Sequence, residues 1–375
     1  MAFRQDSRTV MTLDAGGTTL AFTAVQGTEE IIDPIVLPSP GDDLEQTLQS
    51  IIKGFNEVRA ALSQNPVAIS FSFPGPADYA LGIIDDLENM PAFRGGVALG
   101  PMLEDELGIP VFISNDGDLF AYGEAIAGLL PEINELLQEK GSPKRYQNLF
   151  GATFGTGFGG GIVSRGQLFT GDNSAAGEIN RSRNRLLPEC SLEESVSVHA
   201  VRRVYAREAG LKLEDAPSPE EILEIATGGS GGDAGDPDAA RKAFEELAIV
   251  AGDALAGAVT LVDGLVVIGG GLAGAHSVFL PRLVKEMNRP FSRVSGPDLD
   301  RMEVRAFNLE DEAELAEFVA GGTREITVPH SEMKITYDPL KRIGVGVTRL
   351  GTTKAVAIGA YALALARIDL AEGGA

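Results

Sequence analysis

The chain has 375 residues, 44% hydrophobic and 23% charged, which allows two or three globular domains and excludes a disordered or fibrous protein. Its formal net charge of −23 excludes nucleic acid as a partner, because binding to a phosphate backbone needs clustered lysine and arginine. The single cysteine, Cys190, allows no disulfide within the chain, and residues 1–10 lack the apolar core of a signal peptide. The most apolar stretch, 251–280, is interrupted by acidic residues and glycines. We therefore expect a cytoplasmic protein that does not enter a membrane.

Short strands and amphipathic helices alternate along the first 130 residues. Strands are predicted at 9–13, 20–25, 31–37, 67–73 and 111–114, where β-branched and apolar residues lie between turn residues. Apolar residues recur at helical spacing from Leu44 to Leu62, and a further helix is predicted at 118–129. This alternation predicts an α/β fold with mixed sheets.

A second cycle of the same kind begins near residue 148. It has a predicted strand at 149–154, a glycine-rich turn at 155–161 and a returning strand at 162–164. Further helices are predicted at 192–209, 218–227, 237–259, 277–288, 310–319 and 353–370, with a strand at 265–268. The pattern of strand, glycine-rich turn and strand thus occurs twice, near residues 14 and 155, which indicates a weak internal repeat.

The turn after the first strand is the first candidate site. Its glycines let the backbone approach a phosphate, so that N–H groups at Gly16 and Gly17 and the hydroxyls of Thr18 and Thr19 can point at phosphate oxygens. Asp14 ends the strand and is a candidate Mg²⁺ ligand acting through water, because carboxylate oxygens are hard ligands. The same residues also suit an ordinary hairpin turn, and this segment alone leaves both interpretations open.

Two more glycine-rich turns follow. The segment 155–161 has five glycines in seven residues, more than a hairpin requires, which favours a phosphate cradle. The triplet 269–271 lies between a buried strand and a helix, where adenosine could lie against the backbone, although a plain helix-entry loop is also consistent with it. The candidate nucleotide contacts in these turns are Gly155, Thr156, Gly157, Gly269, Gly270 and Gly271.

The three turns, in this order, resemble the nucleotide site of the actin/hexokinase/Hsp70 superfamily, and in detail the ROK family of repressors, uncharacterised reading frames and sugar kinases. The segments 73–76 (Phe-Pro-Gly-Pro), 89–93 (Asn-Met-Pro-Ala-Phe) and 115–118 (Asn-Asp-Gly-Asp) are similar to the family's sugar-binding and catalytic segments, and 350–363 to its C-terminal helix. The resemblance covers nearly the whole chain except about 289–350. It implies a two-domain actin-like ATPase (ribonuclease H-like) fold with a cleft between the domains, ATP-dependent phosphorylation of a sugar, Mg²⁺ and a homodimer.

Asp116 is the candidate general base. It follows an apolar strand directly, where a carboxylate could accept the proton of a sugar hydroxyl as that oxygen attacks the γ-phosphate of ATP. Asn115 could hydrogen-bond sugar hydroxyls, and the resemblance adds Gly75 and Asn89 to the sugar site. An Asn-Asp pair is also a common helix N-cap, and the resemblance favours catalysis. Asp118 is expected only to favour the helix dipole.

Glu178 lies where the segment resembles the Gly-Glu-x-Gly-His of ROK kinases, whose Glu and His contact sugar. Asn180 and Arg181 stand where that Gly and His are expected. With one cysteine and three histidines the chain cannot build a Cys₃His site, so we expect no structural zinc, and the loop 178–193 must be held by packing or by arginine–carboxylate pairs. Glu193, in a Ser-Leu-Glu that resembles the family's Cys-Leu-Glu, is a further candidate sugar ligand and equally suits the first turn of a helix.

These features together predict two α/β domains. The smaller would comprise 1–116 and 353–375, and the larger 117–352, with an insertion at about 289–350. We expect a glucokinase-like or related hexose or amino-sugar kinase whose partners are ATP and the sugar. The departure at 180–181 keeps a non-catalytic sugar- or nucleotide-binding sensor or scaffold as the alternative, and a carboxylate or polyol kinase on the same fold is a third. A repressor is disfavoured, because the first glycine turn begins near residue 14 and leaves no room before it for a winged helix-turn-helix.

Overall fold

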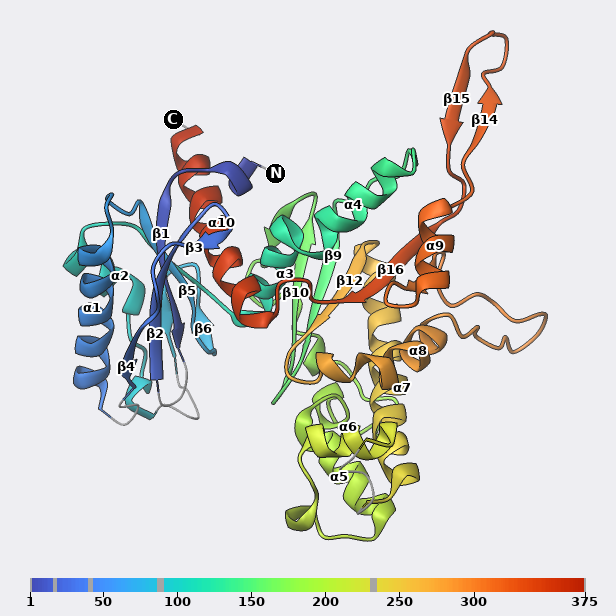
Figure 1. Ribbon diagram of the computed structural model, residues 1–375, viewed down its shortest axis with the longest axis horizontal. Helices are drawn as coiled ribbons and strands as arrows, with labels where there is room; N and C mark the ends of the chain where they lie inside the picture. Colours follow the sequence, from blue (N-terminus) through green and yellow to red (C-terminus); the bar gives the residue numbers. More distant parts are fainter. Residues whose placement is uncertain (1, 16–18, 40–42, 86–90, 230–234, 374–375) are drawn as a thin grey trace. The chain divides into compact units, whose positions relative to one another are not determined.

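The computed structural model describes residues 2–15, 19–39, 43–85, 91–229 and 235–373 (Figure 1). The chain forms two compact units. Unit 1 comprises Met1–Gly128, Gly161–Ala176 and Leu350–Ala375, and unit 2 comprises Leu129–Gly160 and Gly177–Arg349. Within the described ranges, no helix is both long and apolar enough to span a lipid bilayer. The predicted domain division, 1–116 with 353–375 against 117–352, stays a prediction.

The sheet of unit 1 has the strand order β3-β2-β1-β5-β8, with β4 paired to β2. Its strands are β1 (Thr9–Ala15), β2 (Thr19–Gln26), β3 (Glu29–Glu30), β4 (Ile35–Pro38), β5 (Ala68–Ser72) and β8 (Val111–Ser114). β1 and β2 are antiparallel, with Leu13 opposite Phe22, whereas β1, β5 and β8 run parallel. A small second sheet pairs β6 (Ala77–Asp78) with β7 (Ile83–Ile84). The neighbouring parallel strands therefore end at one edge of the main sheet.

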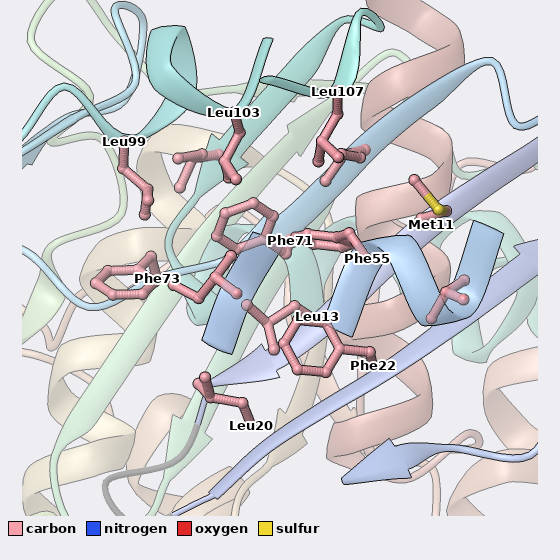
Figure 2. Close-up of a cluster of buried hydrophobic side chains, with 14 of the residues drawn as sticks. Met11, Leu13, Leu20, Phe22, Phe55, Phe71, Phe73, Leu99, Leu103 and Leu107 are labelled. Atoms are coloured by element: carbon pink, nitrogen blue, oxygen red, sulfur yellow. The ribbon is translucent and has the colours of Figure 1, made fainter. Parts of the chain in front are cut away.

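Helices cover both faces of this sheet. They are α1 (Leu44–Ala61), α2 (Leu99–Leu107), α3 (Asp116–Ala127) and α10 (Thr352–Gly373), with 3-10 turns η1 (Ala2–Gln5) and η2 (Pro91–Phe93). One face packs against α1 and α2 through aromatic contacts that run from Phe22 to Phe55 and on to Phe71 (Figure 2). The other face packs against α10, where Tyr361 lies in the same buried cluster as Val10. Successive strand residues point to opposite faces, so both faces of the central strands are apolar.

Two glycines set the contact between α3 and α10. A Cβ atom at Gly123 would overlap the backbone carbonyl of Ala355, and one at Gly359 would overlap the backbone carbonyl of Leu119. Because these neighbours are main-chain atoms of helices, they cannot move aside as a flexible side chain could. The two helix backbones therefore approach as closely as they do only because each carries a glycine at the crossing.

The sheet of unit 2 has the strand order β11-β10-β9-β12-β16-β13. Its strands are β9 (Leu149–Phe154), β10 (Phe158–Ser164), β11 (Gln167–Phe169), β12 (Leu265–Gly269), β13 (Arg305–Asn308) and β16 (Arg342–Val347), and the boundary between the units falls within β10. The strands β9, β12, β16 and β13 are parallel.

The helices of unit 2 include one long helix, α7, against which three of the others pack. They are α4 (Leu129–Glu139), α5 (Val198–Ala209), α6 (Pro219–Thr227), α7 (Pro237–Val262), α8 (His276–Met287) and α9 (Glu312–Ala320), with 3-10 turns η3 (Ile179–Arg181), η4 (Leu192–Glu194), η5 (Leu213–Asp215) and η7 (Ala273–Ala275). α7 contacts α5, α6 and α8, and also β9 and β12. The α7 residues that point inward are mostly alanine, valine and leucine, so the helix is buried along most of its length.

Five strands of each main sheet share one order when β4 and β13 are left out. Numbered along the chain, β1, β2, β3, β5 and β8 lie in the order 3-2-1-4-5. The strands β9, β10, β11, β12 and β16, numbered in the same way, lie in the same order. The weak internal repeat predicted from two glycine-rich turns is therefore confirmed, and it extends over five strands. In the second copy β13 adds a sixth strand beyond β16.

The segment 289–350, for which an insertion is predicted, contains both sheet strands and projecting parts. β13 and β16 lie in the main sheet of unit 2. The projecting parts are the segment 290–301 and the hairpin of β14 (Arg324–Thr327) with β15 (Lys334–Tyr337), which pair only with each other (Figure 1).

Three predicted elements differ from the observed ones. The strand predicted at 31–37 is observed only from Ile35, where β4 begins, because residues 31–34 are not in a strand. β10 begins at Phe158, so the predicted glycine-rich turn 155–161 is only three residues long, and its last three glycines lie in the strand. The predicted helix 192–209 is interrupted after η4, and α5 begins only after Ser197, whose side chain accepts a hydrogen bond from the Ala200 N–H. Serine forms such a cap in an extended conformation, which ends any continuous helix before it.

Candidate functional site

In unit 1, the predicted site residues follow strands that end at one sheet edge. Asp14 is the second-to-last residue of β1. Gly75 follows β5, and Asn115 and Asp116 follow β8 directly. Because β1, β5 and β8 are parallel neighbours, their carboxyl ends lie side by side. This is the edge at which α/β sheets bind ligands. Thr19 begins β2 at the same edge, opposite β1, since Ala15 pairs with Leu20.

Asn115 and Asp116 begin α3. The Asn115 side chain accepts a hydrogen bond of 2.6 Å from the Asp118 N–H, so the N-cap considered for this pair is present. Asp116 is the first helical residue, its carboxylate is exposed, and it accepts a hydrogen bond of 2.9 Å from the Gly117 N–H. An exposed carboxylate whose own bond is local can still accept a proton from a bound molecule.

Asp118 lies in the first turn of α3, as expected, and it also has a structural contact that the sequence did not predict. Its side chain is buried, and the Ser114 hydroxyl donates to its carboxylate at 3.3 Å. Ser114 is the last residue of β8, so this bond joins the end of the strand to the first turn of α3 on both sides of Asp116. The sequence does show that Ser114 and Asp118 are four residues apart on either side of the Asn-Asp pair. The prediction for Asp118 considered only its interaction with the helix dipole and did not use this spacing.

In unit 2, two of the predicted glycine turns lie together. The turns at 155–157 and 269–271 follow β9 and β12, which are parallel neighbours with Gly269 opposite Thr153. Gly270 has a φ of +85°, and a Cβ there would overlap the Phe154 carbonyl. By contrast, a Cβ at Gly155 or Gly271 would meet no atom within 4 Å, so the backbone at both positions is open on that side.

Two later glycines of the 155–161 run lie where another backbone approaches β10. A Cβ at Gly160 would lie 2.5 Å from the Gly177 carbonyl oxygen, and one at Gly161 would lie 2.5 Å from the Gly117 carbonyl oxygen. Glycine at these positions is therefore required by packing. A phosphate cradle in this run stays a prediction.

Glu193 contacts the 155–157 turn directly. Its carboxylate oxygen Oε2 accepts a hydrogen bond of 3.0 Å from the Phe158 N–H, and a Cβ at Gly157 would lie 2.5 Å from the same oxygen. Nearby, the Val198 N–H donates to the Gly155 carbonyl at 2.8 Å. The segment that carries this candidate sugar ligand is thus bonded to the candidate phosphate turn at two points.

The loop 178–193 is organised around the amide side chain of Asn184. Asn184 is fully buried, and its Nδ2 donates to the Ser191 carbonyl at 3.1 Å and the Ser195 hydroxyl at 2.8 Å. Its Oδ1 accepts from the N–H groups of Leu186 and Leu187 at 2.9 and 3.0 Å. The side-chain amide of Asn184 therefore makes four hydrogen bonds, with its donors and its acceptor oxygen bound to different parts of the loop.

Arg185 fixes the same loop to two helices. Its guanidinium pairs with Glu286 on α8 and lies 3.5 Å from Asp253 on α7. Glu286 is fully buried and is also paired with Arg282 and Arg289. Within the described part of the loop 178–193, Arg185 thus supplies ion pairs to two different helices. The expected arginine–carboxylate pairs are therefore present.

Glu178 itself is exposed, just before η3. η3 contacts η4, and the Leu192 N–H donates to the Ser182 carbonyl at 3.1 Å, so Glu178 and Glu193 belong to one folded loop. Four predicted site residues, Gly16, Gly17, Thr18 and Asn89, lie outside the described residues. The structure thus groups Asp14, Thr19, Gly75, Asn115 and Asp116 in unit 1, and the remaining described candidates in unit 2.

Comparison with known proteins gives a family and a fold. The ROK family model matches residues 10–313. The N-acetyl-D-glucosamine kinase of Vibrio parahaemolyticus is 32% identical over 170 residues, 45% of this chain and 51% of that protein. The glucokinase of Halalkalibacterium halodurans is 29% identical over 175 residues, 44% of this chain and 47% of that protein. The chain spans about half the length of the curated relatives it matches.

Two solved structures resemble the whole chain. The crystal structure of a glucokinase from Parabacteroides distasonis is 53% identical, with a TM-score of 0.88, and the match covers 97% of this chain and 99% of that one. The ROK family glucokinase from Streptomyces griseus, in complex with glucose and AMPPNP, is 20% identical with a TM-score of 0.56, covering 94% and 98%. Because the Streptomyces griseus protein is only 20% identical to this chain, its similarity supports the fold alone.

Proposed function

Since this chain belongs to the ROK family, we propose that it transfers the γ-phosphoryl group of ATP to a hydroxyl group of a sugar. The observation that carries the proposal is the edge of the unit 1 sheet, where Asp14, Gly75 and Asp116 follow three parallel neighbours. The names of the similar proteins, glucokinase and N-acetyl-D-glucosamine kinase, narrow the acceptor to a hexose or an N-acetylated amino sugar.

Asp116 is the proposed general base. Its exposed carboxylate accepts the proton of the sugar hydroxyl as the oxygen forms its bond to phosphorus, and the bond from the γ-phosphorus to the bridging oxygen breaks to leave ADP. The side-chain oxygen of Asn115 accepts the hydrogen bond of the helix cap, and its amide N–H groups can donate to a sugar oxygen. The Ser114–Asp118 bond holds the backbone on both sides of Asp116, which limits how far the base can move.

The chain's residues fit ATP and Mg²⁺. The exposed carboxylate of Asp14 is the kind of hard oxygen ligand that Mg²⁺ prefers, and we propose that it binds the ion through water. The backbone is open at Gly155 and Gly271, where phosphate and adenosine can approach without meeting a side chain. Bound ATP supplies the phosphoryl group. Gly16, Gly17, Thr18, Thr19, Thr156, Gly157, Gly269 and Gly270 complete the proposed nucleotide contacts.

The acidic residues of the 178–193 loop are the proposed sugar ligands of unit 2. Glu178 is exposed, and Glu193 has one oxygen bonded to the Phe158 N–H and a second oxygen that can accept from a sugar hydroxyl. With Gly75, Asn89 and Asn115 they make up the sugar contacts that we propose. We further propose that the protein is cytoplasmic and acts as a homodimer.

A coupled assay of ADP release tests the function. The purified chain is given Mg²⁺·ATP with each of a panel of hexoses, N-acetylated amino sugars and pentoses, and the phosphorylated product is identified by its mass. Asp116→Asn removes the base and keeps the shape, so turnover with the accepted sugar falls by about 10²–10⁴-fold while sugar binding persists. The matched control is Asp105→Asn, the same change at an exposed position of α2.

Unimpaired turnover in Asp116→Asn would exclude this residue as the base. If no sugar in the panel stimulates ADP release, although ATP binds, the proposal fails in favour of a non-catalytic binding protein. Equal losses in Asp116→Asn and Asp105→Asn would indicate a general effect of charge removal.

A further inference from the structure

The segment that carries Gly75 has few backbone donors of its own. Residues 74–76 are Pro-Gly-Pro, and proline has no N–H group, so within the segment only Gly75 has a backbone hydrogen to donate. All three residues are exposed. The position of this segment therefore depends on bonds that its carbonyl groups and its two ends make with the rest of unit 1.

Both ends of the segment are bonded to their neighbours. The Phe73 N–H donates to the Ser114 carbonyl at 3.0 Å, and the Asp85 N–H donates to the Pro76 carbonyl at 3.0 Å. The Phe73 ring is almost fully buried, and it contacts the Phe71 ring within the core cluster of Figure 2. These contacts fix the two ends and leave Gly75 between them.

The hydroxyl group of Tyr79 reaches the middle of the segment. It donates to the Phe73 carbonyl at 2.9 Å. A Cβ atom built on Gly75 would lie 3.1 Å from the same hydroxyl oxygen, which is closer than an ordinary van der Waals contact. One hydroxyl therefore holds the carbonyl group two residues before Gly75 and also lies against Gly75 itself. Glycine permits this approach because it has no side chain to press on the hydroxyl.

Tyr79 is itself held in place by a small hairpin. It lies between β6 and β7, where Ala77 pairs with Ile84. The Gly100 N–H donates to the Gly82 carbonyl at 2.9 Å, and a Cβ at Gly82 would lie 2.9 Å from the Gly100 Cα, so the hairpin packs tightly on the start of α2. The Tyr79 ring is half-buried and packs against the core cluster. A hydroxyl on a ring that is fixed in this way can hold a neighbouring loop in one position.

We propose that Tyr79 is a positioning residue of the sugar site, whose hydroxyl sets where the main chain at Gly75 meets the acceptor. The inference rests on the proposed function, in which Gly75 contacts the sugar. Tyr79 acts through the Phe73 carbonyl and through Gly75, and it is not itself a sugar ligand. The nucleotide contacts proposed above lie in other segments of the chain, so the effect of Tyr79 concerns the sugar and not ATP.

Ser114 connects the same segment to the proposed base independently of Tyr79. Its carbonyl accepts from the Phe73 N–H, and its hydroxyl donates to the Asp118 carboxylate at 3.3 Å, with Asp116 between the two residues. Loss of the Tyr79 hydroxyl therefore loosens the Gly75 side of the sugar site and leaves the bonds around Asp116 in place. Sugar binding is weakened, and the chemical step is largely unchanged.

Tyr79→Phe in the whole chain tests the proposal, because it removes only the hydroxyl group. We expect the KM for the accepted sugar, and the Kd for that sugar without nucleotide, to rise about fivefold, since one neutral hydrogen bond is lost. The values of kcat and of the KM for ATP stay within about twofold of wild type. Steady-state kinetics gives the first set of values, and isothermal titration calorimetry gives the Kd.

Gly75→Ala provides a second readout through a double-mutant cycle. In the wild-type background the added methyl group meets the Tyr79 hydroxyl oxygen at 3.1 Å. In the Tyr79→Phe background that oxygen is gone, and the next nearest atom, the Ala77 backbone nitrogen, is at 3.6 Å, an ordinary contact. Gly75→Ala therefore raises the KM for sugar by a factor about threefold larger in the wild-type background than in Tyr79→Phe. A hydroxyl that only stabilised the fold would leave the two effects additive.

Tyr146→Phe is the matched control. It removes the same kind of bond at a buried place in unit 2, where the Tyr146 hydroxyl donates to the Arg342 carbonyl at 2.7 Å. We expect this variant to be less stable than wild type in thermal unfolding and to keep both KM values.

Four results would overturn the positioning role: a wild-type KM for sugar in Tyr79→Phe, equal rises in the KM values for sugar and ATP, additive effects of Gly75→Ala and Tyr79→Phe, or the same rise in the sugar KM in Tyr146→Phe. Each of these is seen in an enzyme that phosphorylates a sugar, so the proposed function survives it. A wild-type chain that neither binds nor phosphorylates any sugar of the panel would overturn the proposed function, and the positioning role with it.

Discussion

Glu193 joins two groups of residues that were predicted separately, the sugar ligands and the nucleotide turn. Its Oε2 accepts from the Phe158 N–H at the end of the 155–157 turn, while the rest of its loop carries Glu178. A hydrogen bond to a charged acceptor contributes about 1.5–3 kcal/mol, enough to influence the conformation of a three-residue turn. Glu193 is therefore a positioning residue for the turn as well as a proposed sugar ligand.

Glu193→Ala removes the acceptor of the Phe158 N–H. If this bond positions the phosphate turn, the KM for ATP rises about tenfold along with the KM for sugar. Glu193→Gln keeps an acceptor oxygen at the same place, so it restores the KM for ATP more fully than the KM for sugar. Steady-state kinetics with each substrate varied in turn gives both values.

The neighbouring residue provides the control for this experiment. Glu194→Ala removes an exposed carboxylate that pairs with Arg203 at 2.6 Å, and it leaves both KM values close to wild type. A Glu193→Ala enzyme whose KM changes only for sugar would contradict the positioning role.

At this scale the sequence predicted where the candidate residues lie better than it predicted their surroundings; their functional roles stay predictions. Asp14, Asn115 and Asp116 were found because polar residues that directly follow apolar strands lie at a sheet edge. The buried state of Asp118 and the loop-organising role of Asn184 were not found. Both depend on partners in the folded loop, and an aspartate or asparagine surrounded by polar residues in the sequence gives no sign of burial.

At the scale of elements, the α3–α10 contact controls how α3, and with it Asp116, lies on unit 1. Gly359→Ala would force a methyl group into the Leu119 carbonyl, and overpacking of this kind costs about 1–3 kcal/mol. We expect the free energy of unfolding to fall by that amount, measured by urea denaturation.

The matched substitution is Gly257→Ala in α7. A Cβ there meets nothing within 4 Å, so alanine only improves helix propensity and stabilises by about 0.5–1 kcal/mol. Opposite signs for the two substitutions support the close crossing. A Gly359→Ala variant as stable as wild type would show that the two helices can separate at little cost.

The loop 178–193 depends on Glu286, whose pKa reflects its partners. Burial alone would raise the pKa of this carboxyl, but the hydrogen bond from Arg185 and the charges of Arg185, Arg282 and Arg289 outweigh it and lower the pKa. A carboxyl with a lowered pKa in the folded state stabilises the protein above its unfolded pKa. That stabilisation is lost as the pH falls through the folded pKa.

Glu286→Gln therefore destabilises the protein at pH 7 and hardly at all in acid. Removing one partner of a fully buried pair costs about 3–5 kcal/mol, and we expect about 2–3 kcal/mol here because the arginines are partly exposed. The difference between wild type and variant, measured by urea denaturation from pH 7 downwards, shrinks below about pH 4.5. A difference independent of pH would mean that the carboxylate charge contributes nothing.

The observed boundaries of helices and strands agree with the predicted ones where capping residues and hydrophobic periodicity indicated the same position. The helices at 218–227 and 353–370 and the strands at 149–154 and 265–268 lie within a residue or a few of their predicted bounds. The run 192–209 and the turn 155–161 were predicted incorrectly. In both, a tertiary contact decided the structure: Glu193 with the Phe158 N–H, and the close approach of Gly177 to Gly160.

At the scale of the whole molecule, the predicted α/β class and the actin-like ATPase fold are confirmed by the sheets and by the similar structures. The internal repeat was visible in the sequence only at its two glycine-rich turns, because those turns need glycine whereas the strands need only apolar side chains. Five strands share one order in the two sheets, although their residues show no matching pattern beyond the turns. The exposure of the β14–β15 hairpin could not be predicted, since an alternation of apolar and polar residues in a short strand does not tell whether its apolar face is buried.

The order of segments along the chain also affects how the protein is made. Unit 1 is assembled from 1–128, 161–176 and 350–375, and its α10 covers the sheet face around Val10, Val25 and Ala68. During synthesis at about 5–20 residues per second, some fifteen seconds to a minute separate β5 from the helix that covers it. A unit 1 sheet that forms during this interval has one apolar face uncovered until α10 is synthesised. Exposed apolar surface of this kind is prone to aggregation until α10 covers it.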